Sequence, residues 1–348
     1  MTKLFLIRHA EAEGNIYRRA HGHFNGQLTK KGHKQVSLLR ARFEGVGIDA
    51  IYSSDLARAR VTATALSEPR RLPISTSEML REVGFGRWED MAWGNLELFE
   101  PEQYSYFVSD PARWGVNGSE AFESVVERMT RFIAEVAAKH DGGSIAVFSH
   151  GFAIKSFFVG LMGLESHESG KVKYSDNTAV ALLHYEGDGF TIEYHGDNSH
   201  LSAENSTFAS QRWWRAEKKW ATENLYYLPL EEARDSALLE QFRLEMGWMP
   251  SVDEGYAAFR SDEQVGMVGI DSADGVGWIS YLYVLPKFRR MGFGEQLLGQ
   301  ALSMSRKAGM GALRVKVPCG SPAASLCEKH GFVVAEETGG DCLMELGN

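Results

Sequence analysis

The chain has 348 residues, which is long enough for about two domains of ordinary size. Hydrophobic residues make up 44% of it and charged residues 24%, a mixture that is typical of globular proteins and excludes a largely disordered chain. The formal net charge of -9 argues against nucleic-acid binding, which needs a basic face, but it allows a local positive pocket for a small anion.

The N-terminus and the cysteines predict a cytoplasmic protein without a membrane segment. The first residues, MTKLFLIRHA, become charged too early for a signal peptide, and no apolar run approaches the roughly 18 residues of a membrane span. Cys319, Cys327 and Cys342 are odd in number and lack zinc-like spacing, so we expect reduced thiols.

Strands and helices alternate in the first part of the chain. Short apolar runs predict strands at Lys3–Ile7, Ile48–Ser53, Ser144–Phe148, Thr178–Tyr185 and Phe190–Tyr194. Helical spacing of apolar residues predicts helices after an N-cap at Thr29 and at Ala57–Leu66, 119–139 and Ala153–Met162. This alternation predicts a largely parallel sheet between two layers of helices. Because sites form at the carboxyl ends of such strands, we expect His9 and His150 to converge.

A second unit is predicted from about Leu225 onward. Residues 201–223 are polar and aromatic, and we interpret them as a connection whose tryptophans (Trp213, Trp214 and Trp220) pack on a domain surface. Beyond them, strands are expected at 225–230, 256–260, 264–270, 278–284, 313–317 and near residue 343. Helices are expected at 233–248 and 323–329, and a basic, glycine-containing loop followed by a helix at 289–307. The predicted division is therefore a domain at 1–205, a linker at 206–223 and a domain at 224–348.

Several motifs of the first domain occur in a fixed order. They are LIRHAEAEGN (6–15), LTKKGHKQV (28–36), SSDLARARVTA (53–63), LREVGFGRWED (80–90), VFSHG (147–151) and NSHL (198–201). Together they resemble the histidine phosphatase superfamily, which also contains cofactor-dependent phosphoglycerate mutases. The resemblance implies a three-layer α/β/α, phosphoglycerate mutase-like domain that transfers phosphoryl groups through a histidine without a metal.

The resemblance also assigns roles to residues of these motifs. It makes His9 the nucleophile that becomes phosphohistidine, and a neutral imidazole suits an anionic phosphate monoester. Arg8 and Arg58 offer forked donors to the phosphate, and His150, if protonated, adds another.

Three further residues complete the predicted site. Glu82 matches the general acid that protonates the leaving group and then activates water. Asn15 matches a donor to the phosphate, and Gly151 gives a backbone amide close access to it. His21 and His23 lack carboxylate or cysteine companions, so no metal site is predicted there.

The sequence departs from the superfamily pattern beside these residues. Ala10 stands where glycine is common, Gly14 where a large aromatic residue is frequent, and Phe152 where a second glycine often follows. These changes affect substrate shape more than phosphoryl transfer. The segment from Glu82 to His150 is compact, which favours a phosphatase over a mutase, since mutases carry a longer insertion there.

A second resemblance lies in YLYVLPKFRRMGFGEQLL at 281–298, which follows the R-x-x-G-x-G pattern at Arg289, Gly292 and Gly294. It is similar to the acetyl-coenzyme A motif of the GNAT acetyltransferases, and SLCEKHGFV at 325–333 is similar to their last helix. Glycines let such a loop wrap a pyrophosphate at a helix N-terminus. The resemblance implies an α+β GNAT acyl-CoA N-acyltransferase domain. The residues it implies for acetyl-CoA binding are Leu282, Val284, Arg289, Arg290, Met291, Gly292, Phe293 and Gly294.

The chemistry of acetyl transfer is left open by the sequence. Cys327 aligns with the tyrosine that protonates the coenzyme A thiolate in the family, but a small buried apolar residue is the favoured interpretation of it. No base for the acceptor amine is identified.

The sequence thus predicts a phosphomonoesterase for a small phosphorylated metabolite, fused to an acetyl-CoA-dependent N-acetyltransferase for an amine. Two alternatives keep enzymatic activity: a phosphatase with a non-catalytic acetyl-CoA-binding regulatory domain, and a mutase-type phosphotransferase. A third is a protein-binding module in which neither site turns over.

Overall fold

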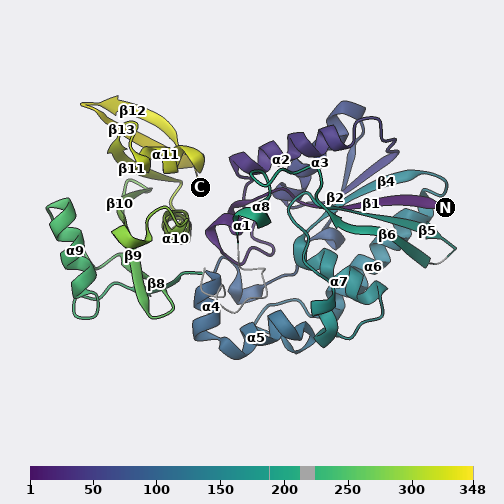
Figure 1. The fold of residues 1–348 in the computed structure, drawn as a ribbon, viewed down its shortest axis with the longest axis horizontal. Helices are drawn as coiled ribbons and strands as arrows, with labels where there is room; N and C mark the ends of the chain where they lie inside the picture. The colour runs from purple at the N-terminus through teal and green to yellow at the C-terminus, as the bar shows by residue number, and fades with distance from the viewer. Residues whose placement is uncertain (188, 212–223, 348) are drawn as a thin grey trace. The chain divides into compact units, whose positions relative to one another are not determined.

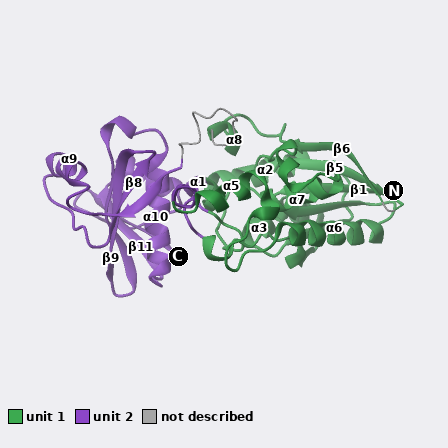
Figure 2. Cartoon of the chain, turned by 90° about the horizontal axis from the view of Figure 1, so that it is seen from below, with its two compact units in different colours: residues 1–15, 20–89, 99–216 green, residues 16–19, 90–98, 217–348 purple. Residues whose placement is uncertain are grey.

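The computed structural model describes residues 1–187, 189–211 and 224–347. It contains two compact units (Figure 2). Unit 1 consists of residues 1–15, 20–89 and 99–216, and unit 2 of residues 16–19, 90–98 and 217–348. The units differ from the predicted sequential division, because 16–19 and 90–98 group with the C-terminal part. The three tryptophans of the predicted connection lie outside the described residues.

Residues 206–211, expected to be linker, pack within unit 1. The hydroxyl of Ser206 donates to Asp176, and that of Thr207 donates to Glu11. Because these polar side chains are buried and satisfied by the unit 1 core, the folded part of unit 1 extends past residue 205.

Unit 1 is built on a six-stranded sheet of order β3-β2-β4-β1-β5-β6. The first four strands in this order are parallel, and β5 and β6 are antiparallel. The strands are β1 (Thr2–Arg8), β2 (Ala50–Ser54), β3 (Ile74–Ser77), β4 (Ser144–Ser149), β5 (Val180–Glu186) and β6 (Gly189–Asp197). The predicted three-layer α/β fold is confirmed, although β3 was not predicted, because only four residues form it and half of them are exposed.

Helices cover both faces of this sheet. The helices up to residue 211 are α1 (Glu13–Tyr17), α2 (Lys30–Arg42), α3 (Ala57–Arg70), α4 (Trp93–Phe99), α5 (Pro101–Ser109), α6 (Phe122–Lys139), α7 (Gly151–Leu161) and α8 (Thr207–Ser210); most of α4 and the end of α1 group with unit 2. Figure 1 shows α2 and α3 on one face and α6 and α7 on the other. The predicted N-cap is present, since the Thr29 hydroxyl accepts the Gly32 amide.

Unit 2 contains a seven-stranded sheet of order β12-β13-β11-β10-β9-β8-β7. Its strands are β7 (Tyr226–Pro229), β8 (Gly255–Arg260), β9 (Glu263–Ala273), β10 (Val276–Val284), β11 (Ala312–Pro318), β12 (Val333–Thr338) and β13 (Asp341–Gly347). Its helices from residue 224 on are α9 (Ser236–Met246), α10 (Phe293–Lys307) and α11 (Pro322–Lys329). The α+β class predicted for this part is confirmed.

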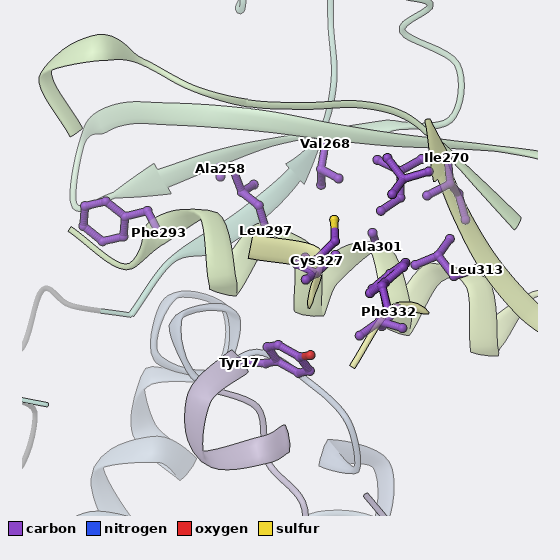
Figure 3. Packing of buried hydrophobic residues seen from close by; sticks show 14 of the residues in the cluster. Tyr17, Ala258, Val268, Ile270, Phe293, Leu297, Ala301, Leu313, Cys327 and Phe332 are labelled. Atoms are coloured by element: carbon purple, nitrogen blue, oxygen red, sulfur yellow. The ribbon is translucent and has the colours of Figure 1, made fainter. Parts of the chain in front are cut away.

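The apolar faces of α10 and α11 pack on this sheet. Figure 3 shows Leu297 and Ala301 of α10 with Cys327 and Phe332 on one side and Val268 of β9 on the other. These side chains are almost fully buried, so the position of α10, and of the loop before it, is fixed by the core.

Two cysteines of unit 2 correct the expectation of reduced thiols. Cys319 and Cys342 form a disulfide, with their Cα atoms 5.1 Å apart, and Cys327 is free and buried. The pairing of β11 with β13 brings the two cysteines together. Among the described residues, none of the helices combines the length and apolar character needed to span a bilayer.

Candidate active sites

His9 and His150 lie beside each other because their strands are neighbours. Arg8, the last residue of β1, pairs with Ser149, the last residue of β4, and each histidine follows directly. The ring centroids of His9 and His150 are 5.1 Å apart, and both rings are buried. The expected convergence of these two strand ends is therefore observed.

His9 is held as a neutral ring with one nitrogen available. Its Nδ1 lies 2.7 Å from the Ala10 carbonyl oxygen, which can only accept, so the proton sits on Nδ1 and the lone pair on Nε2. Burial, with the charges of Arg58 and Arg8, holds the pKa of His9 well below its ordinary value of 6.5. A neutral imidazole with a free lone pair is the form that attacks phosphorus.

His150 is held in the opposite tautomer. Nε of Arg58 donates to its Nδ1 at 3.2 Å, which places the His150 proton on Nε2. Nε2 is buried, and no residue that the structure describes forms a hydrogen bond with it. Burial and the neighbouring Arg58 hold the pKa of His150 well below 6.5, so the protonated ring considered from the sequence is disfavoured. The neutral ring still offers one N–H donor.

Arg8 is buried and anchored at one end only. Its Nη1 donates to the Ser175 carbonyl at 2.6 Å, while Nε is buried and has no hydrogen-bond partner among the described residues. A Cβ atom at Gly151 would lie 3.2 Å from this Nε, so glycine at that position keeps the surroundings of the guanidinium open. Arg8 therefore supplies a fixed positive charge beside His9, together with an Nε–H group that can donate to a ligand.

Protein atoms occupy four of the five N–H groups of Arg58, so that one N–H on Nη1 has no acceptor among the described residues. Besides His150, it donates to the backbone carbonyls of His21, Gly22 and Phe24. This arrangement fixes a buried positive charge whose effect reaches both histidines.

Glu89, which the sequence did not single out, organises the loop that holds Arg58. Its carboxylate accepts the backbone amides of Gly22, His23, Phe24 and Phe85. One carboxylate thus fixes the loop whose carbonyls bind the arginine.

Glu82 lies at the N-terminus of α7, close enough for its charge to act on Arg8 and Arg58. Its oxygens accept the amides of Val83, Phe152 and Ala153 at 2.8–3.0 Å. These bonds fix the orientation of the carboxylate next to the two arginines.

Asn177 supports the backbone of His9, and Asn15 supports that of Ala12. The side-chain oxygen of Asn15 accepts the Ala12 amide, and Asn177 donates to the His9 carbonyl at 2.9 Å. The Thr178 amide donates to the same carbonyl. Asn177 was not predicted; the only sequence signal is the polar run SDNT directly before the buried strand β5.

The glycine loop of unit 2 enters helix α10 through two residues with positive φ angles. Arg290 and Gly292 have φ angles of 64° and 85°, and Gly292 is the N-cap of α10. A side chain at Gly292 would be strained by this left-handed conformation. Arg290, Met291 and Gly292 are exposed, whereas the Phe293 side chain is buried in the core, which leaves only its backbone for a ligand.

Strands β10 and β11, next to this loop, separate along their length. They pair only at the start, from Val276–Trp278 with Ala312–Arg314, although β10 continues to Val284 and β11 to Pro318. The later part of β10, which carries Leu282 and Val284, therefore has backbone groups on the β11 side that β11 does not bind.

No clear acid or base for acetyl transfer is offered by Arg289, Glu245 or Cys327. Arg289 is engaged by protein, since it donates to the Val284 carbonyl and to the Glu245 carboxylate. Arg289, followed by Tyr283, lowers the pKa of Glu245, so this carboxylate is a poor base for an amine. Cys327 lies in the hydrophobic core, and burial raises the pKa of its thiol to about 11.

Comparison with known proteins identifies both parts. Residues 4–198, more than half of the chain, match the histidine phosphatase superfamily (branch 1). The chain belongs to the histidine phosphatase superfamily. Residues 213–332 match the acetyltransferase (GNAT) family, so a GNAT domain follows in the same chain. Both resemblances stated from the sequence are confirmed.

The chain is similar to curated phosphatases over its N-terminal part. It is 30% identical to phosphoserine phosphatase 1 of Hydrogenobacter thermophilus over 186 residues, which are 53% of this chain and 88% of that protein. It is 32% identical to the adenosylcobalamin/alpha-ribazole phosphatase of Escherichia coli over 162 residues, 47% of this chain and 80% of that protein. A phosphoserine phosphatase from Entamoeba histolytica, solved with 3-phosphoglyceric acid, has a TM-score of 0.53 and 26% identity, covering 58% of this chain and all of that one.

Two departures from the superfamily pattern have a structural explanation in this chain. A Cβ atom at Gly14 would lie 2.7 Å from the His21 ring, so His21 occupies the space that a larger residue at position 14 would need. Phe152 stacks on Phe107 with centroids 5.0 Å apart. Both departures thus concern packing against His21 and Phe107 and do not involve the hydrogen bonds of His9.

Proposed function

We propose that unit 1 hydrolyses phosphate monoesters of small metabolites through a phosphohistidine at His9. The observation that carries this proposal is the pair of opposite tautomers. His9 keeps a lone pair on Nε2, while the neighbouring His150 Nε2–H and Arg8 Nε are buried donors without partners among the described residues. Phosphoryl transfer requires a nucleophile that attacks phosphorus and nearby donors that bind the phosphoryl oxygens.

In the first step, Nε2 of His9 attacks phosphorus, the N–P bond forms and the P–O bond to the leaving group breaks. Arg8 and His150 donate to the phosphoryl oxygens, and the buried charge of Arg58 stabilises the negative charge that develops on them. Glu82, in its acid form, gives its proton to the leaving alkoxide.

In the second step, a water molecule attacks the phosphohistidine. Glu82, now a carboxylate, accepts a proton from this water, the N–P bond breaks, and inorganic phosphate and the neutral His9 ring are released. The amides that bind Glu82 support both steps because they hold its carboxyl group in one place. Asn15 and Gly151 are proposed to contact the phosphate through an amide and a backbone N–H.

We further propose that the GNAT domain binds acetyl-CoA. The positive φ angles of Arg290 and Gly292 and the separated strands β10 and β11 fit the pyrophosphate and the pantetheine arm, which would be held by the loop at Arg289–Gly294 and by the backbone of Leu282 and Val284. The first hypothesis is that the domain transfers the acetyl group to an amine. The alternative is a regulatory domain that binds acetyl-CoA without turnover. The core position of Cys327 favours the alternative over a thiol acid.

The phosphatase proposal is tested with the full chain and a radiolabelled phosphomonoester. We expect release of inorganic phosphate and a protein-bound phosphoryl group that survives alkali and is lost in acid, as phosphohistidine is. His9→Ala should abolish both, whereas His33→Ala, which removes an exposed histidine of α2, should change neither. Turnover by His9→Ala at the wild-type rate would refute the mechanism, and transfer of the label to a second metabolite in place of water would favour the mutase alternative.

The acetyl-CoA proposal is tested separately. Acetyl-CoA should raise the unfolding temperature of the GNAT domain, and thiol release in the presence of an amine panel separates a transferase from a binding domain. Without any thermal shift, both acetyl-CoA proposals fail.

A further inference from the structure

We propose that Arg128 of α6 is a positioning residue for Glu82, the proposed general acid. It holds the backbone of residues 79–84, which we call the Glu82 segment, so that the carboxyl group stays within reach of the oxygen that leaves phosphorus. This inference rests on the proposed phosphatase function, and it adds a residue that acts on one step of it, the protonation of the leaving group.

The Glu82 segment lacks the regular hydrogen bonds that hold helices and strands in place. A short 3-10 helix ends at Leu80, and residues 81–84 belong to neither a helix nor a strand. The carbonyl groups of such a backbone need side chains or water as partners, and they are only as fixed as those partners are. Backbone amides orient the carboxylate of Glu82, but its main-chain carbonyl needs a separate partner.

Arg128 binds three carbonyl groups of the Glu82 segment with one guanidinium. Its Nη1 donates to the carbonyls of Met79 and Arg81, both at 2.7 Å, and its Nη2 donates to the carbonyl of Glu82 at 3.1 Å. Three acceptors within four consecutive residues suit the planar fork of an arginine, which a lysine ammonium cannot reproduce. The backbone of Glu82 is therefore held against helix α6.

Glu120 orients Arg128 and binds the other end of the Glu82 segment. Its carboxylate accepts Nε of Arg128 at 2.6 Å and Nη2 at 2.9 Å, so all five N–H groups of the guanidinium have acceptors. The backbone amide of Glu120 donates to the Gly84 carbonyl, and its carboxylate accepts the Gly84 amide. Only 12% of the Arg128 side chain and 21% of the Glu120 side chain are exposed, so solvent screens this ion pair only in part.

These contacts indicate that Arg128 acts through Glu82 rather than on the phosphate. Since all of its N–H groups are engaged by protein, none is left for a phosphoryl oxygen. Its charge nevertheless reaches the site, because it adds to burial, Arg58 and His9 in lowering the pKa of His150. Loss of Arg128 should therefore impair the step that Glu82 performs more than it impairs phosphate binding.

A matched pair of aryl phosphates tests the proposal on the full chain. Phenyl phosphate and p-nitrophenyl phosphate share one ring, but phenolate needs a proton from the acid far more than p-nitrophenolate does. The ratio kcat/KM reports the steps up to cleavage of the P–O bond. Arg128→Met should lower it roughly 10-fold for phenyl phosphate and by less than about threefold for p-nitrophenyl phosphate. The Glu82 carbonyl keeps its contact with His23 at 3.0 Å, so the loss should stay below that of Glu82→Gln.

A double variant separates positioning from a general effect on structure. If Arg128 acts through Glu82, adding Arg128→Met to Glu82→Gln should change kcat/KM for phenyl phosphate by less than about twofold, because the positioned group is already gone. Arg128→Lys retains the cation without the fork and should recover part of the rate. Arg131→Met is the control: it removes an arginine of the same helix whose side chain is 57% exposed, and it should change neither ester.

A second position provides the test if Arg128→Met does not fold, which thermal unfolding of each variant reports directly. Glu120→Gln keeps the shape of the carboxylate and removes its charge, so its hold on Arg128 weakens. It should show the same dependence on the leaving group to a smaller extent.

The outcomes distinguish this inference from the function on which it rests. The inference is overturned if a folded variant of Arg128 or Glu120 lowers both esters by the same factor. It is equally overturned if Arg128→Met slows Glu82→Gln as much as it slows the wild type. If the wild type hydrolyses neither ester, the phosphatase function itself is wrong, and the inference falls with it.

Discussion

The candidate sites of the two units hold their charged groups in different ways. In unit 1, Arg8, Arg58, His9 and His150 are buried, and backbone groups from distant segments fix their hydrogen bonds. In unit 2, the glycine loop is exposed and offers its own backbone, while Arg289 is paired with Glu245 at the surface. Preorganised buried charge is what a reaction needs, whereas an exposed backbone loop suffices to bind an anion. The comparison therefore assigns chemistry to unit 1 with more support than to unit 2.

The largest expected effect concerns Glu82 and depends on the leaving group. Glu82→Gln should lower kcat for an alkyl phosphate by about 10³-fold, because an alkoxide cannot leave without a proton. p-Nitrophenolate leaves unprotonated, so its release should slow much less. Comparing the two substrates by steady-state kinetics checks this prediction, and equal losses would show that Glu82 acts on structure rather than on the leaving group.

The buried histidines should make stability depend on pH. The pKa values of His9 and His150 are lowered from 6.5 in the folded state, so below about pH 6.5 the unfolded chain takes up protons that the folded chain does not. The free energy of unfolding should therefore reach its full value above that pH. Between about pH 6.5 and about pH 5 it should fall by up to roughly 2 kcal/mol per histidine. Urea unfolding of the wild type and His9→Asn measures it: the variant should show the shallower pH dependence, and parallel curves would contradict the assignment.

The support of Arg58 by Glu89 should be visible in catalysis. Glu89→Ala removes the acceptor for four loop amides, so the carbonyls that hold Arg58 should shift and kcat/KM should fall roughly 10- to 100-fold. Glu123→Ala, in the first turn of α6, is the control. Unchanged activity in Glu89→Ala would mean that the loop is held by other contacts.

In unit 2, the prediction concerns binding alone. Gly292→Val places a branched side chain at a φ of 85° and should weaken acetyl-CoA binding at least about tenfold, without changing phosphatase activity. Isothermal titration with acetyl-CoA measures the affinity. An unchanged Kd would exclude this loop as the coenzyme site.

Much of the fold, the loop that follows β1 and the glycine loop of unit 2 could be predicted, because the residues that indicate each of them lie close together in the sequence. Strand-end histidines, the Thr29 cap and the R-x-x-G-x-G pattern each lie within a few residues of sequence. The missed features depend on contacts between distant segments: Glu89 binds amides at 22–24, Asn177 holds the carbonyl of His9, and β11 and β13 bring Cys319 to Cys342. Arg58 shows the same limit, since its position was predicted but the loop that occupies most of its donors was not. The catalytic roles themselves remain predictions.

The smallest expected effect decides what Cys327 does. Its side chain lies in the core cluster of unit 2, and burial raises the pKa of the thiol to about 11, so the thiol stays protonated and packed. Cys327→Ala should lower the free energy of unfolding by only about 1 kcal/mol, through the small cavity that it leaves, and acetyl-CoA affinity should not change. If the domain acetylates an amine, the rate should also be retained, because a core thiol cannot approach the coenzyme A sulfur without unpacking the helix. A loss of rate in Cys327→Ala with unchanged affinity and stability would restore the thiol as the acid, and unit 2 would then join unit 1 as a site that carries chemistry.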